Sequence, residues 1–363
     1  MKIKSACIDR TLCALDFKAA DKIPAVGGFV RHPRFLAETA GVSEAEFWEA
    51  PRKTAIEAFR RLKADLVIQV ILPNPNLTDG GSFEVVPDER FKSPEDVRDY
   101  VLSLPSKQEV SANFDFKKYF DEYVTCMKHG QEECGEMLWI PGRFDSAPIF
   151  QMERSFGAEN YYMALALYPE EMAQFFEQDA ERAFLENQAI AAATEKENLA
   201  PVVWVGQDTC DLRGTIVAPS ILDEIYFPAL RRALSPLVEA GLKIIWHSDG
   251  NITPIVPRLL EAGVDGFQGL QEKLGVPVDL EKLSKESTIK GRNPIIVGSI
   301  SSTTVLPFGS PEDVRIEVER CIKIAKSRGG GFLLNSSSSV GPEVPIENLR
   351  AMFEHCAEQS KIQ

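Results

Sequence analysis

The chain has 363 residues, of which 44% are hydrophobic and 26% charged, a composition typical of a globular protein with a large apolar core. Forty lysines and arginines against 54 aspartates and glutamates give a formal net charge of −14. This excess of negative charge repels nucleic-acid phosphates and anionic lipid head groups, so we expect neither nucleic acid nor a membrane surface as a partner. No stretch approaches the uninterrupted apolar length that a membrane-spanning helix requires.

Seven cysteines are scattered along the chain, and no two of them have the CxxC spacing. An odd number at wide spacing argues against a disulfide framework and favours a reducing compartment. The first residues lack the long apolar run of a secretory signal. We therefore expect a cytoplasmic protein.

Eight short apolar runs alternate with longer stretches that have apolar residues at helical spacing, a pattern typical of parallel strands joined by crossover helices. The expected strands are residues 25–30, 65–72, 136–140, 201–205, 242–246, 266–270, 294–298 and 332–335. Eight strands without a break in composition predict a single (β/α)8 TIM barrel over residues 1–363, with helical insertions in its N-terminal part. An open doubly wound sheet is the alternative.

Between these strands the apolar spacing predicts the crossover helices. They are expected at residues 47–63, 94–104, 109–129, 156–193, 221–240, 254–262, 278–287, 310–326 and 346–358. Pro169 should divide the 156–193 segment into two helices. The clearest start is at Ser310 and Pro311, because serine caps a helix and proline suits its first position.

The reaction centre of such a barrel lies at the carboxyl ends of its strands, so the polar residues that follow each apolar run are candidates. His247 ends the fifth run, and Asp249 lies on the same side of an extended chain. A histidine there can bind a metal, transfer a proton or hold a substrate oxygen; the alternative is a buried histidine that caps a loop. Asp208 and Cys210 follow the neighbouring fourth run and could join His247 around Zn²⁺, or else cap a loop and lie inert.

These positions define the predicted site. We expect catalytic roles for His247, Asp249, Asp208, Gln207 and Asn251. We expect substrate binding by Arg31, Gln69, Arg143, Gln268, Asn335 and Ser338. The expected metal ligands are His247, Asp249 and Glu272.

Two segments carry a family resemblance: residues 241–269, GLKIIWHSDGNITPIVPRLLEAGVDGFQG, and residues 329–354, GGGFLLNSSSSVGPEVPIENLRAMFE. Both resemble the uroporphyrinogen decarboxylase superfamily, and the resemblance implies the same barrel. True decarboxylases of that superfamily have an arginine-rich segment after strand one, an aspartate after strand two and a histidine after strand eight. Here Arg31 and Arg34 have an altered spacing, strand two offers Gln69, and Ser338 falls near the histidine position. The tetrapyrrole decarboxylase residues therefore look absent.

The other branch of the superfamily contains the methyltransferases of corrinoid-dependent systems, whose zinc is held by His-x-Cys after strand five and a cysteine after strand eight. Here only His247 matches, and Asp249 and Ser338 stand near the two cysteine positions. A zinc site would need oxygen ligands such as Asp249, Asp208 or Glu272. Such a harder Lewis acid suits the oxygen of an ether or hydroxyl group better than a thiol.

The resemblance implies a methyltransferase component of an anaerobic, O-demethylase-like system, which moves a methyl group from a small methylated substrate to a corrinoid protein. That partner would supply the corrinoid, and barrels of this size often form homodimers. Two alternatives stay open. One is a metal-independent decarboxylase or lyase that holds a carboxylate with Arg31, Arg34 or Arg143. The other is a non-catalytic relative that binds a corrinoid or tetrapyrrole.

Overall fold

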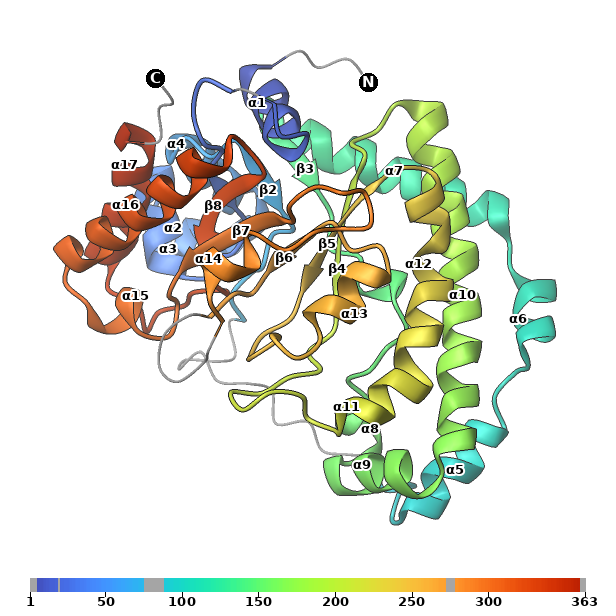
Figure 1. Cartoon of the computed structure of the whole chain (residues 1–363). Helices are drawn as coiled ribbons and strands as arrows, with labels where there is room; N and C mark the ends of the chain where they lie inside the picture. Colours follow the sequence, from blue (N-terminus) through green and yellow to red (C-terminus); the bar gives the residue numbers. More distant parts are fainter. Residues whose placement is uncertain (1–4, 19, 75–87, 272–277, 360–363) are drawn as a thin grey trace.

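The computed structural model describes residues 5–18, 20–74, 88–271 and 278–359 (Figure 1). In that part of the chain every predicted strand is present. The strands are β1 Val26–Gly27, β2 Leu66–Ile68, β3 Leu138–Ile140, β4 Val202–Gly206, β5 Lys243–His247, β6 Gly266–Gln268, β7 Ile295–Ile300 and β8 Phe332–Ser336.

All strand pairs are parallel, in two runs ordered β1-β2-β3 and β4-β5-β6-β7-β8. Three parallel bridges join the runs, and one of them pairs Val30 with Val340 just beyond β1 and β8. Gly142 pairs with Trp204 between β3 and β4, and Ala25 pairs with Leu334 between β1 and β8. The backbone N–H of Leu334 also donates to the carbonyl of Pro24 at 2.8 Å. The ring of strands is thereby closed, so the predicted (β/α)8 barrel is confirmed and the open sheet is rejected.

The helices of the first half are shorter and more numerous than predicted. They are α1 Ala6–Leu15, α2 Pro33–Ala40, α3 Glu44–Glu49, α4 Pro51–Arg61, α5 Pro94–Leu102, α6 Lys107–Asn113 and α7 Phe116–Cys134. The predicted helix 47–63 is two helices, because Ala50 precedes Pro51 and a residue before proline avoids the helical conformation. The predicted helix 109–129 breaks at Phe114, which is extended. Sequence analysis missed α1 and α2.

The helices of the second half match most of the predicted ranges, but the predicted helix 278–287 is only four residues long, and a short helix at 305–308 was not predicted. They are α8 Glu153–Phe156, α9 Ala158–Leu167, α10 Pro169–Glu197, α11 Pro219–Ile221, α12 Phe227–Glu239, α13 Val256–Glu261, α14 Leu280–Leu283, α15 Val305–Phe308, α16 Pro311–Arg328 and α17 Ile346–Gln359. The predicted break at Pro169 is confirmed, and α16 begins with a capping box between Ser310 and Asp313. A π-helical turn, Leu222–Tyr226, leads into α12.

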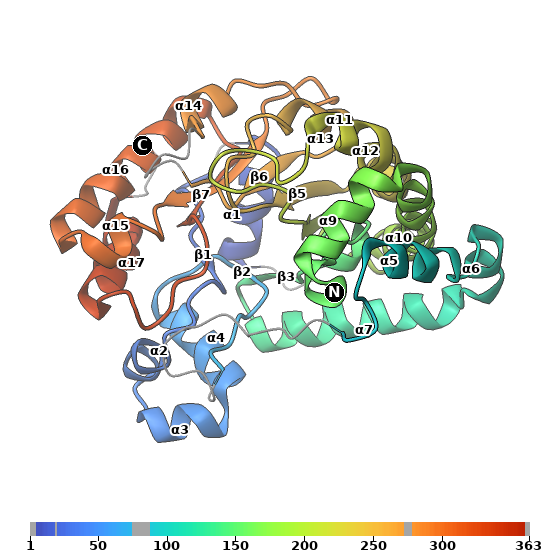
Figure 2. The ribbon, with the colours of Figure 1, turned by 90° about the horizontal axis from the view of Figure 1, so that it is seen from below.

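Alternate residues of each strand face two separate cores. The inward set fills the barrel and includes Val26, Leu66, Ile68, Leu138, Ile140, Val202, Trp204, Ile245, Ile295, Val297 and Leu333. Ala14 and Leu15 of α1 belong to the same cluster, so this helix closes the barrel at the end where the strands begin (Figure 1). The outward set, with Trp246 and Phe267, packs under the helices. The opposite end, seen from below in Figure 2, is therefore the one available for a site.

Two aspartates fasten the closed end of the barrel. Asp65 precedes β2 and accepts from the backbone N–H of Ala25 at 2.9 Å, while Asp265 precedes β6 and accepts from that of Ile244 at 3.1 Å. Each carboxylate is about 1% exposed and is paired with two cationic side chains. These buried charges are compensated, so their role is to tie neighbouring strands together.

No helix in the described ranges is long and apolar enough to cross a membrane. The seven cysteines all lie in described segments, and each is a free thiol.

Candidate active site

Strand register brings the predicted catalytic residues to one place. Gly206 of β4, His247 of β5 and Gln268 of β6 are Cα partners across three neighbouring strands. Because side chains alternate along a strand, His247 points to the same side as the inward-facing Ile245. Its register partner Gln268 points the same way. Asp208 stands two residues beyond Gly206 and therefore turns to the same mouth of the barrel.

The hydrogen bonds around His247 fix which ring nitrogen carries the proton. Gln268 donates its amide N–H to the carbonyl of Ser337 at 3.1 Å, so its Oε1 faces the imidazole. That Oε1 lies 2.5 Å from Nδ1 of His247, and an amide oxygen can only accept. Nδ1 therefore carries the hydrogen, and in the neutral ring Nε2 presents a lone pair to the mouth.

Two carboxylates face this lone pair. Oδ1 of Asp208 lies 3.9 Å from Nε2 of His247 and accepts from the backbone N–H of Asp249 at 2.8 Å. Its Oδ2 accepts from the amide of Gln151 at 3.2 Å. Asp249 contributes Oδ2, which accepts from the hydroxyl of Ser338 at 3.3 Å. The predicted convergence of β4, β5 and the chain after β8 is thus present.

Asp249 is half-buried, and one of its carboxylate oxygens is buried and unsatisfied. Its Oδ1 is inaccessible to solvent and has no hydrogen-bond partner. Burial raises the pKa of the Asp249 carboxyl above its usual value, and the charge of Asp208 raises it further, against the opposing effects of His247 and Ser338. A buried carboxylate in this state is costly unless a cation or a proton completes it.

These residues fit a divalent metal. One ligand atom from each of Asp208, His247 and Asp249 lies within 4.8 Å of the others, and across the described ranges this is the one such group of three. Nε2 of His247 and one carboxylate oxygen from each aspartate are the donors a metal would take. The donor set is one nitrogen and two oxygens, with no thiolate, which suits zinc and equally suits harder divalent ions.

Cys210 stands apart from this group. Its thiol is buried, contacts the hydroxyl of Thr209 at 3.9 Å, and has a pKa raised to about 11 by burial. Glu272, the third predicted metal ligand, lies outside the described residues.

An aromatic wall covers one side of the imidazole. The ring centroid of Trp204 lies 5.3 Å from that of His247, and the centroid of Phe144 lies 6.1 Å from it, edge to face. The ring centroids of Phe144 and Trp204 also lie 4.9 Å from each other. A pocket of about 700 Å³ opens beside this wall, lined by Gly142, Phe144, Asp145, Ile149, Gln151, Arg154, Gln207, Asp208 and His247.

The loop after β3 forms most of this pocket, and Gln207 holds it in place. The amide oxygen of Gln207 accepts from the backbone N–H of Phe150 at 2.9 Å, and its N–H donates to the carbonyl of Phe144 at 3.3 Å. With 3% of its surface exposed, Gln207 supports the pocket from behind. The catalytic role expected for Gln207 stays a prediction.

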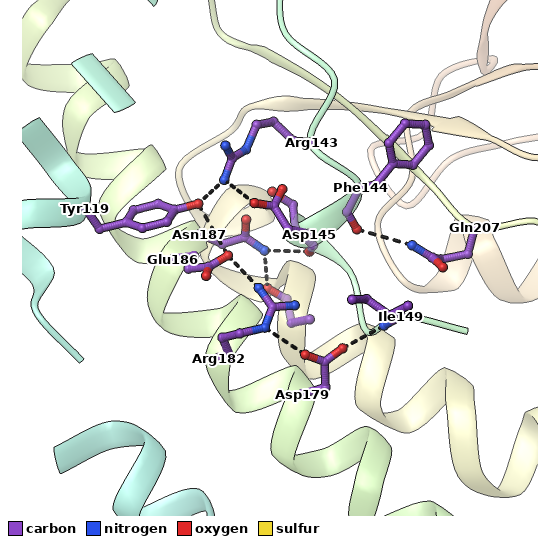
Figure 3. Close-up of polar contacts among 12 residues, drawn as sticks. Tyr119, Arg143, Phe144, Asp145, Ile149, Asp179, Arg182, Glu186, Asn187 and Gln207 are labelled. Atoms are coloured by element: carbon purple, nitrogen blue, oxygen red, sulfur yellow. Dashed lines mark hydrogen bonds and ion pairs between the residues drawn. The ribbon is translucent and has the colours of Figure 1, made fainter. Parts of the chain in front are cut away.

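Figure 3 shows a polar network that fastens the same loop to α10. Asp179 accepts from the backbone N–H of Ile149 at 2.7 Å and pairs with Arg182, which also pairs with Glu186. Asn187 donates to the carbonyls of Ser146 and Ala233, at 2.9 and 2.8 Å. Burial raises the pKa of the Glu186 carboxyl, and Arg182 opposes that effect.

Arg143, predicted to bind substrate, belongs to this network. Its guanidinium contacts the hydroxyl of Tyr119 and pairs with Asp145 at 2.8 Å (Figure 3). It also lies within cation–π distance of the rings of Tyr119 and Tyr123. These contacts direct the side chain toward α7, away from the Phe144 ring. Arg143 therefore has protein partners for its charge.

The remaining predicted residues lie around the mouth. Arg31 follows β1, and its buried Nε has no partner. Gln69 lies against Gly142, where an added Cβ would meet its Oε1 at 2.2 Å. Asn335 is the register partner of Ser299, and its buried Nδ2 has no partner. Asn251 stabilises its own loop, since its Oδ1 accepts from the backbone N–H of Thr253 at 3.2 Å.

Sequence analysis missed Phe144, Ile149, Gln151 and Arg154 as pocket residues. All four lie in or just after the loop that follows β3, where the sequence analysis named only Arg143. The length of that loop could have indicated these residues, because long loops at strand ends are common sites of function. The loop separates β3 from a long helical insertion.

Comparison with known proteins gives three findings. A family model described as uroporphyrinogen decarboxylase (URO-D) matches residues 153–359. The methylated-thiol–coenzyme M methyltransferase of Methanosarcina mazei is 24% identical over 144 residues, 40% of this chain and 35% of that protein, so the chain matches about a third of this curated relative. A solved structure of a methyltransferase from Methanosarcina mazei has a TM-score of 0.64 at 18% identity, covering 98% of this chain and 99% of the other. That structure shares the fold.

Proposed function

The chain belongs to the uroporphyrinogen decarboxylase family, and from this membership we propose that it is a methyltransferase that transfers a methyl group from a methylated substrate to a corrinoid held by a partner protein. The observation that carries the proposal is the group of Asp208, His247 and Asp249 at the barrel mouth, with one buried oxygen of Asp249 unsatisfied. Similarity to a methyltransferase over 144 residues supports it.

Asp208, His247 and Asp249 would hold the metal. When bound, it would act as a Lewis acid on the heteroatom that carries the methyl group. Gln268 holds the hydrogen of the neutral His247 ring on Nδ1, so that Nε2 offers the lone pair, and Gln151 with the backbone of Asp249 orients Asp208. Phe144 and Trp204 exclude water from one side of the imidazole. The site would therefore be ordered before the substrate arrives.

In methyl transfer, the bond between the methyl carbon and the heteroatom breaks. Its electron pair stays on the heteroatom, which takes up a proton. Cobalt(I) of the corrinoid supplies the pair for the new cobalt–carbon bond. Because Asp249 would be bound to the metal, that proton reaches the heteroatom from solvent at the open pocket.

A metal-independent decarboxylase is the second candidate, and the structure gives it fewer free arginines than sequence analysis expected. Arg143 is engaged by Tyr119 and Asp145, and Arg34 lies on α2 paired with Glu38 at 2.8 Å. Among the described residues Arg31 is the one member of that set without an ion pair, although Arg143 also keeps a buried Nε without a partner. The arrangement therefore supports methyl transfer over decarboxylation.

The test is methyl transfer to free cob(I)alamin from a panel of aryl methyl ethers and methylamines, followed by the loss of cobalt(I) absorbance. We expect transfer from at least one donor, and its loss in His247→Ala. Inactivity across the panel together with no bound metal would overturn the proposal. Release of carbon dioxide from an acid without cobalamin would favour the decarboxylase, and tight corrinoid binding without turnover would favour a carrier.

A further inference from the structure

The pocket beside His247 is lined by one cationic side chain, Arg154, that is unpaired among the residues the structure describes. The lining has three charged side chains apart from the histidine: Asp145, Asp208 and Arg154. Asp145 is paired with Arg143, and Asp208 accepts from Gln151 and from the backbone of Asp249. Arg154 is exposed on the short helix α8 and makes no ion pair or hydrogen bond with any residue in the described ranges.

The same pocket has an apolar side. Phe144 is 36% exposed and Ile149 37% exposed, and both line the pocket with Arg154. The network of Figure 3 holds this wall rigidly, since Asp179 binds the backbone N–H of Ile149 and Gln207 binds the carbonyl of Phe144. A large apolar surface kept open on a fixed loop is suited to the body of a ligand.

The pocket is too large for a one-carbon donor alone. Its volume of about 700 Å³ is within the range of sites that enclose drug-sized molecules. Methanol or methylamine displaces about two waters, roughly 60 Å³, and would leave most of the pocket hydrated. A donor with a ring or a short chain would fill the space between His247 and Arg154.

From these features we propose that the methyl donor is an amphipathic anion. Its methylated heteroatom lies at His247, its apolar body contacts Phe144 and Ile149, and its carboxylate or other anionic group pairs with Arg154. This inference rests on the proposed function for the identity of the donor, but the preference for an anion is a property of the pocket and is measurable by binding alone. Arginine suits this role because its fork of donors matches a carboxylate.

The test uses two probes of nearly the same shape, para-methoxybenzoate and its neutral amide, with affinities measured by isothermal titration calorimetry. We expect the wild type to bind the acid about five- to tenfold more tightly than the amide, in line with one charge-assisted pair at a partly exposed site. Arg154→Ala should bring the acid down to the affinity of the amide and leave the amide unchanged. The difference should shrink at high salt.

Arg213→Ala is the matched control, because Arg213 is an exposed arginine on the loop after β4 that is paired with Asp211 and does not line the pocket. This variant should keep the preference for the acid. Equal binding of acid and amide by the wild type, no binding of either, or an unchanged preference in Arg154→Ala would overturn the inference. If the preference is present and depends on Arg154 while no methyl transfer occurs, the anion site stands and the methyltransferase proposal fails.

Discussion

Asn187 on α10 offers the sharpest test of how the pocket is held together. Its side chain is fully buried and donates to the carbonyls of Ser146, on the pocket loop, and Ala233, on α12. Asn187→Ala removes both hydrogen bonds, at about 1 kcal/mol each, and the lost volume adds about another 1 kcal/mol. The higher helix propensity of alanine stabilises the variant by roughly 0.5 kcal/mol. We expect a loss of about 2–3 kcal/mol in the free energy of unfolding, measured in urea.

Asn348 on α17 provides a control with the same geometry elsewhere. It is also buried and donates to the carbonyls of Leu306 and Gly309, both at 2.8 Å. Asn348→Ala should lose a similar free energy of unfolding and keep the affinity for para-methoxybenzoate, whereas Asn187→Ala should weaken that affinity severalfold. A loss below about 1 kcal/mol in Asn187→Ala, or equal effects of the two variants on ligand binding, would refute the reasoning.

Gln268→Ala removes the acceptor that orients His247, and we expect a 10- to 100-fold weaker metal affinity in calorimetry with little change in fold. Burial raises the pKa of Cys210 to about 11, so at pH 8 it stays a thiol and should react with iodoacetamide far more slowly than the exposed Cys126; equal labelling by mass spectrometry would contradict this. Asp265→Asn leaves two cationic side chains uncompensated and should cost about 3–5 kcal/mol in urea unfolding without changing metal affinity.

The sequence was sufficient for the barrel and for the centre of the site. Buried parallel strands are short continuous apolar runs, so all eight could be located, and neighbouring strands necessarily end at one mouth. That reasoning correctly brought Asp208, His247 and Asp249 together. It also selected Gln268, but as a substrate ligand; its contact with Nδ1 of His247 depends on the register of β5 and β6.

The remaining features depend on contacts between distant segments. Arg143 follows β3, yet its direction is set by Tyr119 and Tyr123 on α7, about twenty residues earlier in the chain. Phe144 and Arg154 become pocket residues only because α10 and Gln207 hold their loop. The short helices α1 and α2 were missed, since eight to ten residues give a weak periodic signal.

The proposed chemistry requires a metal held by Asp208, His247 and Asp249, and the metal content of the purified protein measures whether one is bound. After loading with a divalent ion and removal of excess, elemental analysis should find about one ion per wild-type chain and far less in His247→Ala and Asp249→Asn. His355→Ala is the matched control, because His355 lies on α17 and pairs with Glu319 at 3.1 Å, so it should keep the wild-type content. Equal metal in all four proteins, or none in the wild type, would contradict the account.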